Sequence, residues 1–242
     1  MKLVISSSEL LKGILTVSKA IPAKSTEAIL EDYLFVLEGD KLEVTASDKE
    51  ITMKTVITVD CTEEEGRFAV PARQLNDLLK ELPDQPITIS TISENQFKCA
   101  WASGESTLPY FNPDDYPESQ TTGDDANVVE FPGQSLADGI GRTLYASSDE
   151  ENRPVMNSIF FDITPNSTTL VASDLQKLTC YTADDVKAEV PCSFILNKRH
   201  AAVLKSVIGK DVENVTIKFD SKVAIFSFDN TTIICCLVVG KY

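Results

Sequence analysis

The 242-residue sequence has few of the residues from which catalytic and metal sites are usually built. It contains a single histidine, His200, and six cysteines that form no C-x-x-C pair, so it offers no zinc-site spacing. It also lacks the G-x-S-x-G and H-E-x-x-H motifs and the glycine-rich loops that hold phosphates. We therefore expect no catalytic residue, no metal and no cofactor, and a structural or solvent-facing role for His200.

Long hydrophobic runs are absent as well. The apolar residues near the N-terminus are interrupted by the polar segment 6–9, so the sequence predicts neither a signal peptide nor a transmembrane span. Five of the six cysteines lie in apolar or alternating runs, which favours buried free thiols in a reducing cytosol over a secreted disulfide framework. These features predict a cytoplasmic protein.

Basic residues are scarce. The chain has 22 Lys and Arg against 37 Asp and Glu, a net charge of -15. Taken as an average, this charge argues against a nucleic-acid partner. A nucleic-acid partner is compatible with this charge if the basic and acidic residues lie on different parts of the fold.

The feature that organises the sequence is an internal repeat with an offset of about 126 residues. The matched positions are Phe68 with Phe194, Arg73 with Arg199, Leu78 with Leu204, 46–48 with 172–174, and Tyr116 with Tyr242. One fold of about 120 residues is therefore expected twice. A stretch rich in Pro, Asp, Ser, Thr and Gly runs from 112 to 127. We expect domains at 1–120 and 128–242, joined by a linker at 121–127.

Periodicity predicts two helices and a set of strands in each copy. The expected helices are 8–20, with Ser8 as N-cap, 71–82, 133–147 and 198–209. The expected strands are 2–5, 33–37, 41–47, 50–59, 66–70, 86–92, 95–102, 105–109, 156–163, 167–173, 176–182, 188–196, 214–219, 222–228 and 231–239. The acidic run 63–65 is interpreted as a turn, and Asp48 and Asp174 are expected in Asx-type turns. Strands joined by short turns predict an α+β fold with antiparallel sheets.

Charge is not spread evenly over these elements. The predicted helices hold four acids and nine basic residues, namely Lys12, Lys19, Arg73, Lys80, Arg142, Lys198, Arg199, Lys205 and Lys210. Their net charge is +5, whereas the remainder, with 13 basic and 33 acidic residues, carries -20. For any one helix, solvent-facing Lys and Arg explain the pattern equally well. As a set, the helices form a surface that could attract phosphates while the rest of the protein repels them.

Several ordered segments resemble one known family. They are the opening 1–13, Val70–Arg73, Leu108–Pro109 with 115–117, the run 152–161 (NRPVMNSIFF), 170–178 and the ending 239–242. Together they resemble the bacterial DNA polymerase III beta subunit, the replicative sliding clamp. The resemblance implies tandem clamp domains, each with two helices packed on antiparallel sheets. It also implies a non-enzymatic processivity factor whose subunits close head to tail into a ring around duplex DNA and tether the polymerase.

The resemblance also assigns residues. Lys24 matches a basic loop position that contacts DNA in the family, and Arg73, Lys198 and Arg199 match basic helix positions, so Lys24 joins the nine residues above as the predicted DNA-binding set. Peptides from the DNA polymerase and the clamp loader would bind a groove formed partly by Arg153, Met156, Ser173, Leu175, Gln176, Lys177 and Leu178. The family often has Gly-His-Arg at 175–177, which this chain replaces, and core packing is the alternative interpretation of Met156 and Leu178.

The family has a third domain that these 242 residues lack, so we expect a fragment of the ring-forming subunit, monomeric by itself and weak in binding DNA. Three alternatives remain open from the sequence. One is a two-domain clamp that closes as a trimer. Another is an acidic two-domain enzyme with its site in an interdomain cleft, which a pocket with paired titratable groups would favour. The third is a protein-binding scaffold with no DNA role.

Overall fold

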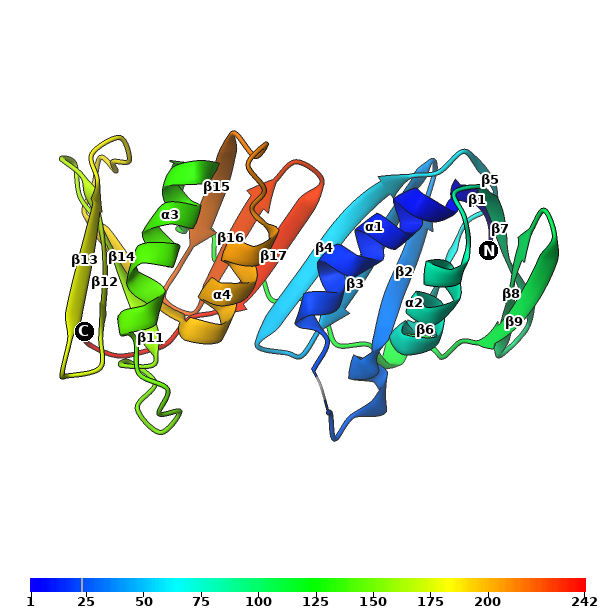
Figure 1. Ribbon diagram of the computed structural model, residues 1–242, viewed down its shortest axis with the longest axis horizontal. Helices are drawn as coiled ribbons and strands as arrows, with labels where there is room; N and C mark the ends of the chain where they lie inside the picture. Colours follow the sequence, from blue (N-terminus) through cyan, green and yellow to red (C-terminus); the bar gives the residue numbers. More distant parts are fainter. Residues whose placement is uncertain (23) are drawn as a thin grey trace. The chain divides into compact units, whose positions relative to one another are not determined.

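The computed structural model describes residues 1–22 and 24–242, and the chain divides into two compact units, Met1–Ser119 (unit 1) and Gln120–Tyr242 (unit 2). Each unit contains two α-helices and antiparallel strands (Figure 1). The predicted α+β class is confirmed. Within the described residues, no helix combines the length and the apolar character needed to cross a membrane.

Unit 1 contains two helices and two antiparallel sheets. Its elements are β1 (Lys2–Ser6), α1 (Ser7–Val17), β2 (Asp32–Glu38), β3 (Lys41–Ser47), β4 (Ile51–Thr58), β5 (Cys61–Glu64), β6 (Gly66–Pro71), α2 (Ala72–Glu81), β7 (Pro86–Ser93), β8 (Gln96–Trp101) and β9 (Gly104–Pro109), with short 3-10 turns η1 (Ser18–Ala20), η2 (Ala28–Glu31) and η3 (Pro113–Asp115). Strand order is β5-β1-β7-β8-β9 in one sheet and β4-β3-β2-β6 in the other.

Unit 2 repeats this scheme. Its elements are β10 (Asn127–Pro132), α3 (Gly133–Thr143), η4 (Leu144–Ala146), β11 (Ser158–Ile163), β12 (Thr168–Ser173), β13 (Leu178–Ala183), β14 (Cys192–Asn197), α4 (Lys198–Val207), β15 (Asn214–Phe219), β16 (Val223–Phe228) and β17 (Thr231–Cys236). Strand order is β10-β15-β16-β17 and β13-β12-β11-β14. Among the strands that the structure describes in unit 1, β5 alone has no counterpart: the matching residues, 187–190, form no strand.

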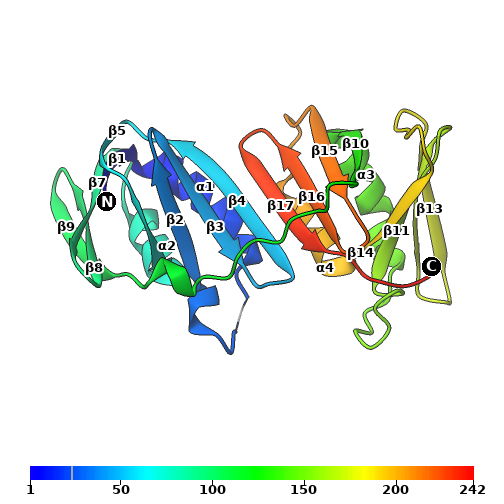
Figure 2. The ribbon, with the colours of Figure 1, turned by 180° about the vertical axis from the view of Figure 1, so that it is seen from behind.

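In each unit the two helices lie side by side and cover one face of the strands, which Figure 1 shows from the helix side and Figure 2 from the strand side. Helix α1 contacts β3, β4 and α2, and α3 contacts β12, β13 and α4. The apolar spacing explains this arrangement. In α2, Leu75 and Leu79 are buried one turn apart, and burying a leucine side chain contributes about 1.5–3 kcal/mol.

Aromatic side chains fill the core at matching places in the two units. Phe35 and Phe68 have ring centroids 5.8 Å apart, and their counterparts Phe161 and Phe194 stack at 4.5 Å. All four side chains are buried. The repeat seen in the sequence therefore extends to the packing, since the same pair of facing strands supplies the same pair of rings.

Several sequence expectations about the elements are wrong in detail. The strand expected at 188–196 starts only at Cys192, as β14. The N-cap of α1 is Ser6, whose side chain accepts from the Glu9 N–H at 3.4 Å, and Ser8 lies inside the helix. The acidic run 63–65, interpreted as a turn, overlaps the edge strand β5 (Cys61–Glu64), which pairs with β1. Residues 127–132, of which 127 is expected in the linker and the rest in no element, form β10, the counterpart of β1. Edge strands are short and partly polar, so their hydrophobic pattern is weak.

The expectation of buried thiols is correct for only part of the set. All six cysteines are free, with Cys99 and Cys235 buried, Cys192 and Cys236 half-buried, and Cys61 and Cys180 exposed. The two exposed thiols lie on β5 and β13, which border their sheets. Alternation along an edge strand places every second side chain in solvent.

The start of α3 is crowded against the backbone. A Cβ atom on Gly133 would overlap the carbonyl oxygen of Val212, while one on Gly141, later in the same helix, would meet only the flexible end of Lys205 at 2.9 Å. We expect Gly133→Ala to lower the free energy of unfolding by roughly 1–3 kcal/mol, because backbone cannot move aside as a side chain can.

Gly141→Ala is the matched control, and it should be neutral or stabilise by up to about 1 kcal/mol through helix propensity. Chemical denaturation followed by circular dichroism measures both variants. Equal destabilisation of the two would show that the Val212 carbonyl does not constrain the start of this helix.

Candidate nucleic-acid interface and partner groove

The predicted DNA-binding residues on the helices are mostly exposed. In unit 1 these are Lys12, Arg73 and Lys80, and in unit 2 Arg142, Arg199 and Lys205. Arg73 and Lys80 lie seven residues apart on α2, while Leu75 and Leu79 face the core. Because α1 contacts α2 and α3 contacts α4, each unit carries its exposed helical cations on one pair of adjacent helices.

The helix boundaries change the charge count. Lys19 lies in η1 and Lys210 follows the end of α4 at Val207, so neither belongs to an α-helix. Within the described residues, the four α-helices carry seven Lys and Arg against four Asp and Glu, a net charge of +3, and the rest of the chain carries 15 against 33. The segregation is smaller than predicted, but its sign is unchanged. Lys24 lies exposed in the loop between η1 and η2.

Two of the predicted cations already have partners inside unit 2. Lys198 Nζ donates to the Ser147 carbonyl oxygen at 3.1 Å and pairs with Asp149 Oδ1 at 2.6 Å. This hydrogen bond and charge lower the pKa of Asp149. The Arg142 guanidinium lies 5.6 Å from the centre of the Tyr181 ring, within cation–π range. Both side chains would have to exchange or share these partners to reach a phosphate.

The predicted groove residues 173–178 form one tight turn between β12 and β13. Asp174 Oδ1 accepts from the N–H groups of Gln176 at 3.0 Å and Lys177 at 2.9 Å, and Ser173 Oγ accepts from the Leu175 N–H at 3.1 Å. The Lys177 ammonium also pairs with Asp174, and these bonds lower the pKa of Asp174 to about 2. The Asx-type turn expected at Asp174 is confirmed.

Unit 1 builds the same turn at 47–51. Asp48 Oδ1 accepts from Glu50 N at 3.0 Å and Ile51 N at 2.8 Å, and Ser47 Oγ accepts from Lys49 N at 3.1 Å. The residue that follows the aspartate has a left-handed backbone in both units, with φ of 76° at Lys49 and 73° at Leu175. The turn geometry is therefore set by the serine and aspartate, and the side chain at the left-handed position is free to differ.

Leu175 combines backbone strain with exposure. A leucine at positive φ costs on the order of 1–2 kcal/mol, because Cβ approaches its own carbonyl oxygen. Its side chain is nevertheless 69% exposed, and Leu178, where β13 starts, is 65% exposed. Packing does not explain either leucine, so core packing is the wrong interpretation of Leu178. An apolar pair held out in solvent by a rigid turn is typical of a binding surface.

The other two predicted groove residues lie in the loop before β11. Arg153 is exposed and pairs with Glu150 at 3.1 Å, and the half-buried Met156 accepts a backbone hydrogen bond from Ser148 at 2.9 Å. No hydrogen bond or ion pair in the described part of the chain joins Arg153 or Met156 to the 173–178 turn. Their assignment to one groove stays a prediction.

Two aromatic residues near this turn were not predicted as part of the site. Tyr145 is 64% exposed, and its hydroxyl lies 2.9 Å from Thr179 Oγ1, next to Leu178. Tyr242 stacks on Phe160 at 5.4 Å and lies beside the Ser173 backbone, and burial raises the pKa of its hydroxyl. The sequence repeat singled out Tyr242, because it matches Tyr116; Tyr116 is buried and Tyr242 is half-buried. No pattern in the sequence pointed to Tyr145.

The structure offers little material for catalysis around these surfaces. His200 is buried in α4, as a structural role requires. In the part of the chain that the structure describes, no three His, Cys, Asp or Glu residues are placed to hold a metal ion. One pocket does carry neighbouring titratable groups, Glu31 and Asp32 of unit 1. This is the kind of pocket that the enzyme alternative predicts, so it does not count against that alternative.

Comparison with known proteins identifies the repeated unit. The N-terminal domain of the DNA polymerase III beta subunit matches residues 1–120, and the central domain of the same protein matches residues 130–242. The Beta sliding clamp of Halalkalibacterium halodurans is 26% identical over 254 residues, covering 100% of this chain and 66% of that protein. The Beta sliding clamp of Staphylococcus aureus is 28% identical over 234 residues, covering 93% of this chain and 61% of that protein.

Solved structures agree on the fold. The DNA polymerase sliding clamp from Bacillus subtilis has a TM-score of 0.94 at 22% identity, and a Pseudomonas aeruginosa sliding clamp bound to griselimycin has 0.94 at 23%. Each match covers 100% of this chain and 66% of the other. The chain thus spans about two thirds of the length of the relatives it matches. Since the two matched domains together cover nearly all of the sequence, the chain belongs to the DNA polymerase III beta subunit family.

Proposed function

We propose that this chain is part of a ring-forming clamp subunit that encircles duplex DNA and tethers a replicative polymerase. The observation that carries the proposal is the charge of the helices: seven basic against four acidic residues, in a chain whose net charge is -15. A replication role would place the protein in the cytoplasm, with the chromosome.

Physical reasoning supports this use of the charges. A clamp held by topology must slide, so its contacts should be weak and should go to phosphates rather than to bases. Exposed, flexible side chains such as Lys12, Lys80 and Lys205 suit such contacts. The acidic remainder of the chain would repel DNA from other surfaces and favour binding at the helices.

The names of the relatives support the same proposal. Proteins called Beta sliding clamp match along the whole chain, but they are longer by about half of its length. We therefore propose the head-to-tail, two-copy ring for a subunit of the relatives' full length. For residues 1–242 alone we propose a monomer that binds duplex DNA weakly, without sequence preference.

The 173–178 turn is the proposed contact for partner proteins. Its exposed leucines, Leu175 and Leu178, lie on a turn held by at least four hydrogen bonds, and Tyr145 contacts Thr179, the residue after Leu178. We propose that short peptide segments of a DNA polymerase and of the clamp loader place apolar side chains on this surface. Met156 and Arg153 would extend the groove.

We expect the triple variant Lys198→Glu, Arg199→Glu, Lys205→Glu of residues 1–242 to lose most of its affinity for duplex DNA. The slope of log K against log salt should also become shallower, by about 0.9 for each phosphate that the variant no longer neutralises. Fluorescence anisotropy with a labelled duplex at several low salt concentrations measures both quantities.

A matched control reverses three exposed lysines elsewhere in unit 2, as Lys187→Glu, Lys218→Glu and Lys222→Glu. Both variants change the net charge equally. If they weaken binding and reduce the slope equally, only net charge matters and the helices are not the interface.

The ring itself is tested with a subunit of full length. Loaded onto nicked circular DNA, it should remain bound through a high-salt wash, and cutting the circle should release it from the ends. Residues 1–242 should be washed off both forms of DNA. Equal retention on circles and on linear DNA would contradict encirclement.

We expect Leu175→Asn to raise the free energy of unfolding by up to about 1 kcal/mol, because asparagine tolerates the left-handed backbone better than leucine does. The same change should weaken binding of a synthetic peptide from the replicative polymerase by roughly 10-fold or more, since it removes an exposed apolar anchor. Denaturation and anisotropy with a labelled peptide measure the two effects.

Lys49→Asn provides the control in unit 1, at the same backbone conformation and outside the proposed groove. It should give a similar gain in stability with unchanged peptide binding. Unchanged peptide binding in Leu175→Asn would remove Leu175 from the groove.

A further inference from the structure

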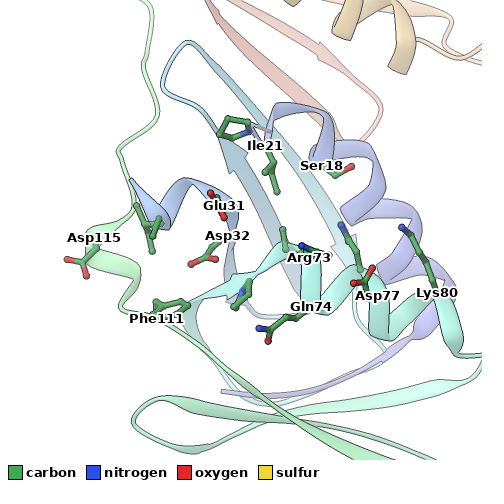
Figure 3. Close-up of a pocket in the computed structure, with 16 residues that line it drawn as sticks. Ser18, Ile21, Glu31, Asp32, Arg73, Gln74, Asp77, Lys80, Phe111 and Asp115 are labelled. Carbon is green, nitrogen blue, oxygen red and sulfur yellow. The ribbon is translucent and has the colours of Figure 1, made fainter. Parts of the chain in front are cut away.

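Unit 1 contains a pocket of about 900 Å³, and of its lining residues only Arg73 and Lys80 belong to the predicted DNA-binding set (Figure 3). It lies between η1 and the residues that follow it, η2, and α2 from Ala72 to Lys80. Its walls are mixed: Ile21 and Phe111 are apolar, while several charged side chains line the rest. The volume is at the upper end of the range for ligand sites.

Asp32 is the unusual group in this pocket. The residue is only 5% exposed, and in Figure 3 its carboxyl group points into the cavity rather than toward Arg73. No side chain or backbone N–H in residues 1–22 and 24–242 donates a hydrogen bond to this carboxyl group, and none forms an ion pair with it. The carboxyl oxygens are accessible from the cavity, so a donor from outside the chain can reach them.

The repeat shows that the fold does not need a carboxyl group here. The matching residue in unit 2 is Ser158, which is fully buried and donates its hydroxyl to the Pro154 carbonyl oxygen at 2.6 Å. An ionised aspartate has no proton to donate in that way. At this position unit 2 has a hydrogen-bonded hydroxyl, whereas unit 1 has a carboxyl group that faces the cavity.

The charges around the pocket are arranged with the negative groups at one end. In Figure 3, Glu31, Asp32 and Asp115 lie toward Phe111, whereas Arg73 and Lys80 follow α2 along the other wall, with Asp77 between them. Desolvation and the neighbouring Glu31 raise the pKa of Asp32 to about 6. In Figure 3 the Asp115 carboxylate points away from Asp32, so a cation at the acidic end would be stabilised mainly by Asp32 and Glu31.

We infer that the acidic end of this pocket binds the cationic side chain of an arginine or lysine from a partner polypeptide, with an adjacent apolar side chain against Ile21 and Phe111. Phe111 is 48% exposed, and it provides the apolar contact next to the carboxylates. A polypeptide is favoured over a free small cation because the cavity leaves room for the neighbours of the basic residue. The inference is independent of DNA encirclement and of the 173–178 turn.

The test uses residues 1–242 and two tripeptides, acetyl-Leu-Arg-Leu-amide and its neutral analogue with citrulline in place of arginine. Titration followed by amide NMR should give saturable shifts at residues 31–32, 71–77 and 111 with the arginine peptide. The citrulline peptide should bind roughly 10-fold more weakly or worse, because a charge-assisted hydrogen bond is replaced by a neutral one. Equal binding of the two peptides, or shifts located elsewhere, would overturn the inference.

Asp32→Ser, which installs the residue of unit 2, should lower affinity for the arginine peptide by roughly 10-fold, and a melting curve should show that the variant is folded. Asp40→Asn removes one exposed carboxylate from the β2–β3 turn of the same unit and should leave affinity unchanged. An equal drop in affinity in the two variants would assign the effect to net charge and overturn the role of Asp32. Agmatine, a free guanidinium compound, should bind more weakly than the peptide, and tighter binding of agmatine would contradict a polypeptide partner.

A pH titration gives a second readout. Arginine stays charged, so affinity should fall as Asp32 takes up a proton, by about 10-fold between pH 7 and pH 5 for a pKa of about 6. Glu31 is the charged neighbour of Asp32, Tyr33 and Tyr116 lie close to it, and Asp77, Asp115, Arg73 and Lys80 line the same pocket. The pH dependence of peptide affinity that remains in Asp32→Ser measures the titration of these other groups. A profile that is identical in the variant and the original protein would exclude Asp32 as the binding group.

Discussion

Burial of one apolar stripe on each helix is the constraint on which the rest of this structure depends. In α2, Leu75 and Leu79 must face the strands, and the helix geometry then directs Arg73 and Lys80 to the opposite side. The basic character of the helix layer is thus a consequence of core packing combined with the choice of residues on the solvent side. No separate element is needed to present cations, which is why an acidic chain can have a basic surface on its helices.

Duplication lets the two units keep one scaffold and differ at single positions. The Ser-Asp turn has the same hydrogen bonds in both, yet its left-handed residue is Lys49 in unit 1 and the exposed Leu175 in unit 2. Residue Asp32 takes the place of Ser158 at the start of an equivalent strand. The left-handed backbone is common to both units, so the difference lies in the side chains: Leu175 is exposed, whereas Lys49 pairs with Glu27. Asp32 likewise lacks the hydrogen bond that Ser158 makes. The proposals of separate binding surfaces on the two units rest on these differences.

The sequence predicts the fold well because its strongest patterns are those that packing also uses. Strands 41–47 and 214–219 have the predicted bounds, since each alternates clearly between apolar and polar residues. It fails at β5 and β10, where pairing to a neighbouring strand decides the structure and residues such as Glu63 and Asn127 obscure the pattern. The aspartate turns were predictable because Asx hydrogen bonds are local, involving groups two and three residues apart.

The sites were predictable only to the extent that they are local. The turn at 173–178 is continuous in sequence, so its members could be named together. Tyr145 joins that surface through a contact with Thr179, 34 residues away, and the partners of Lys198 come from the loop near Asp149. The pocket of unit 1 gathers residues from 18 to 115, and Asp32 alone looks like any strand-end acid. Asp32 stands out because the residue is only 5% exposed, opens onto the cavity and has no donor to its carboxyl group among the residues that the structure describes. The sequence identifies the carboxylate, but its surroundings are known only from the tertiary structure.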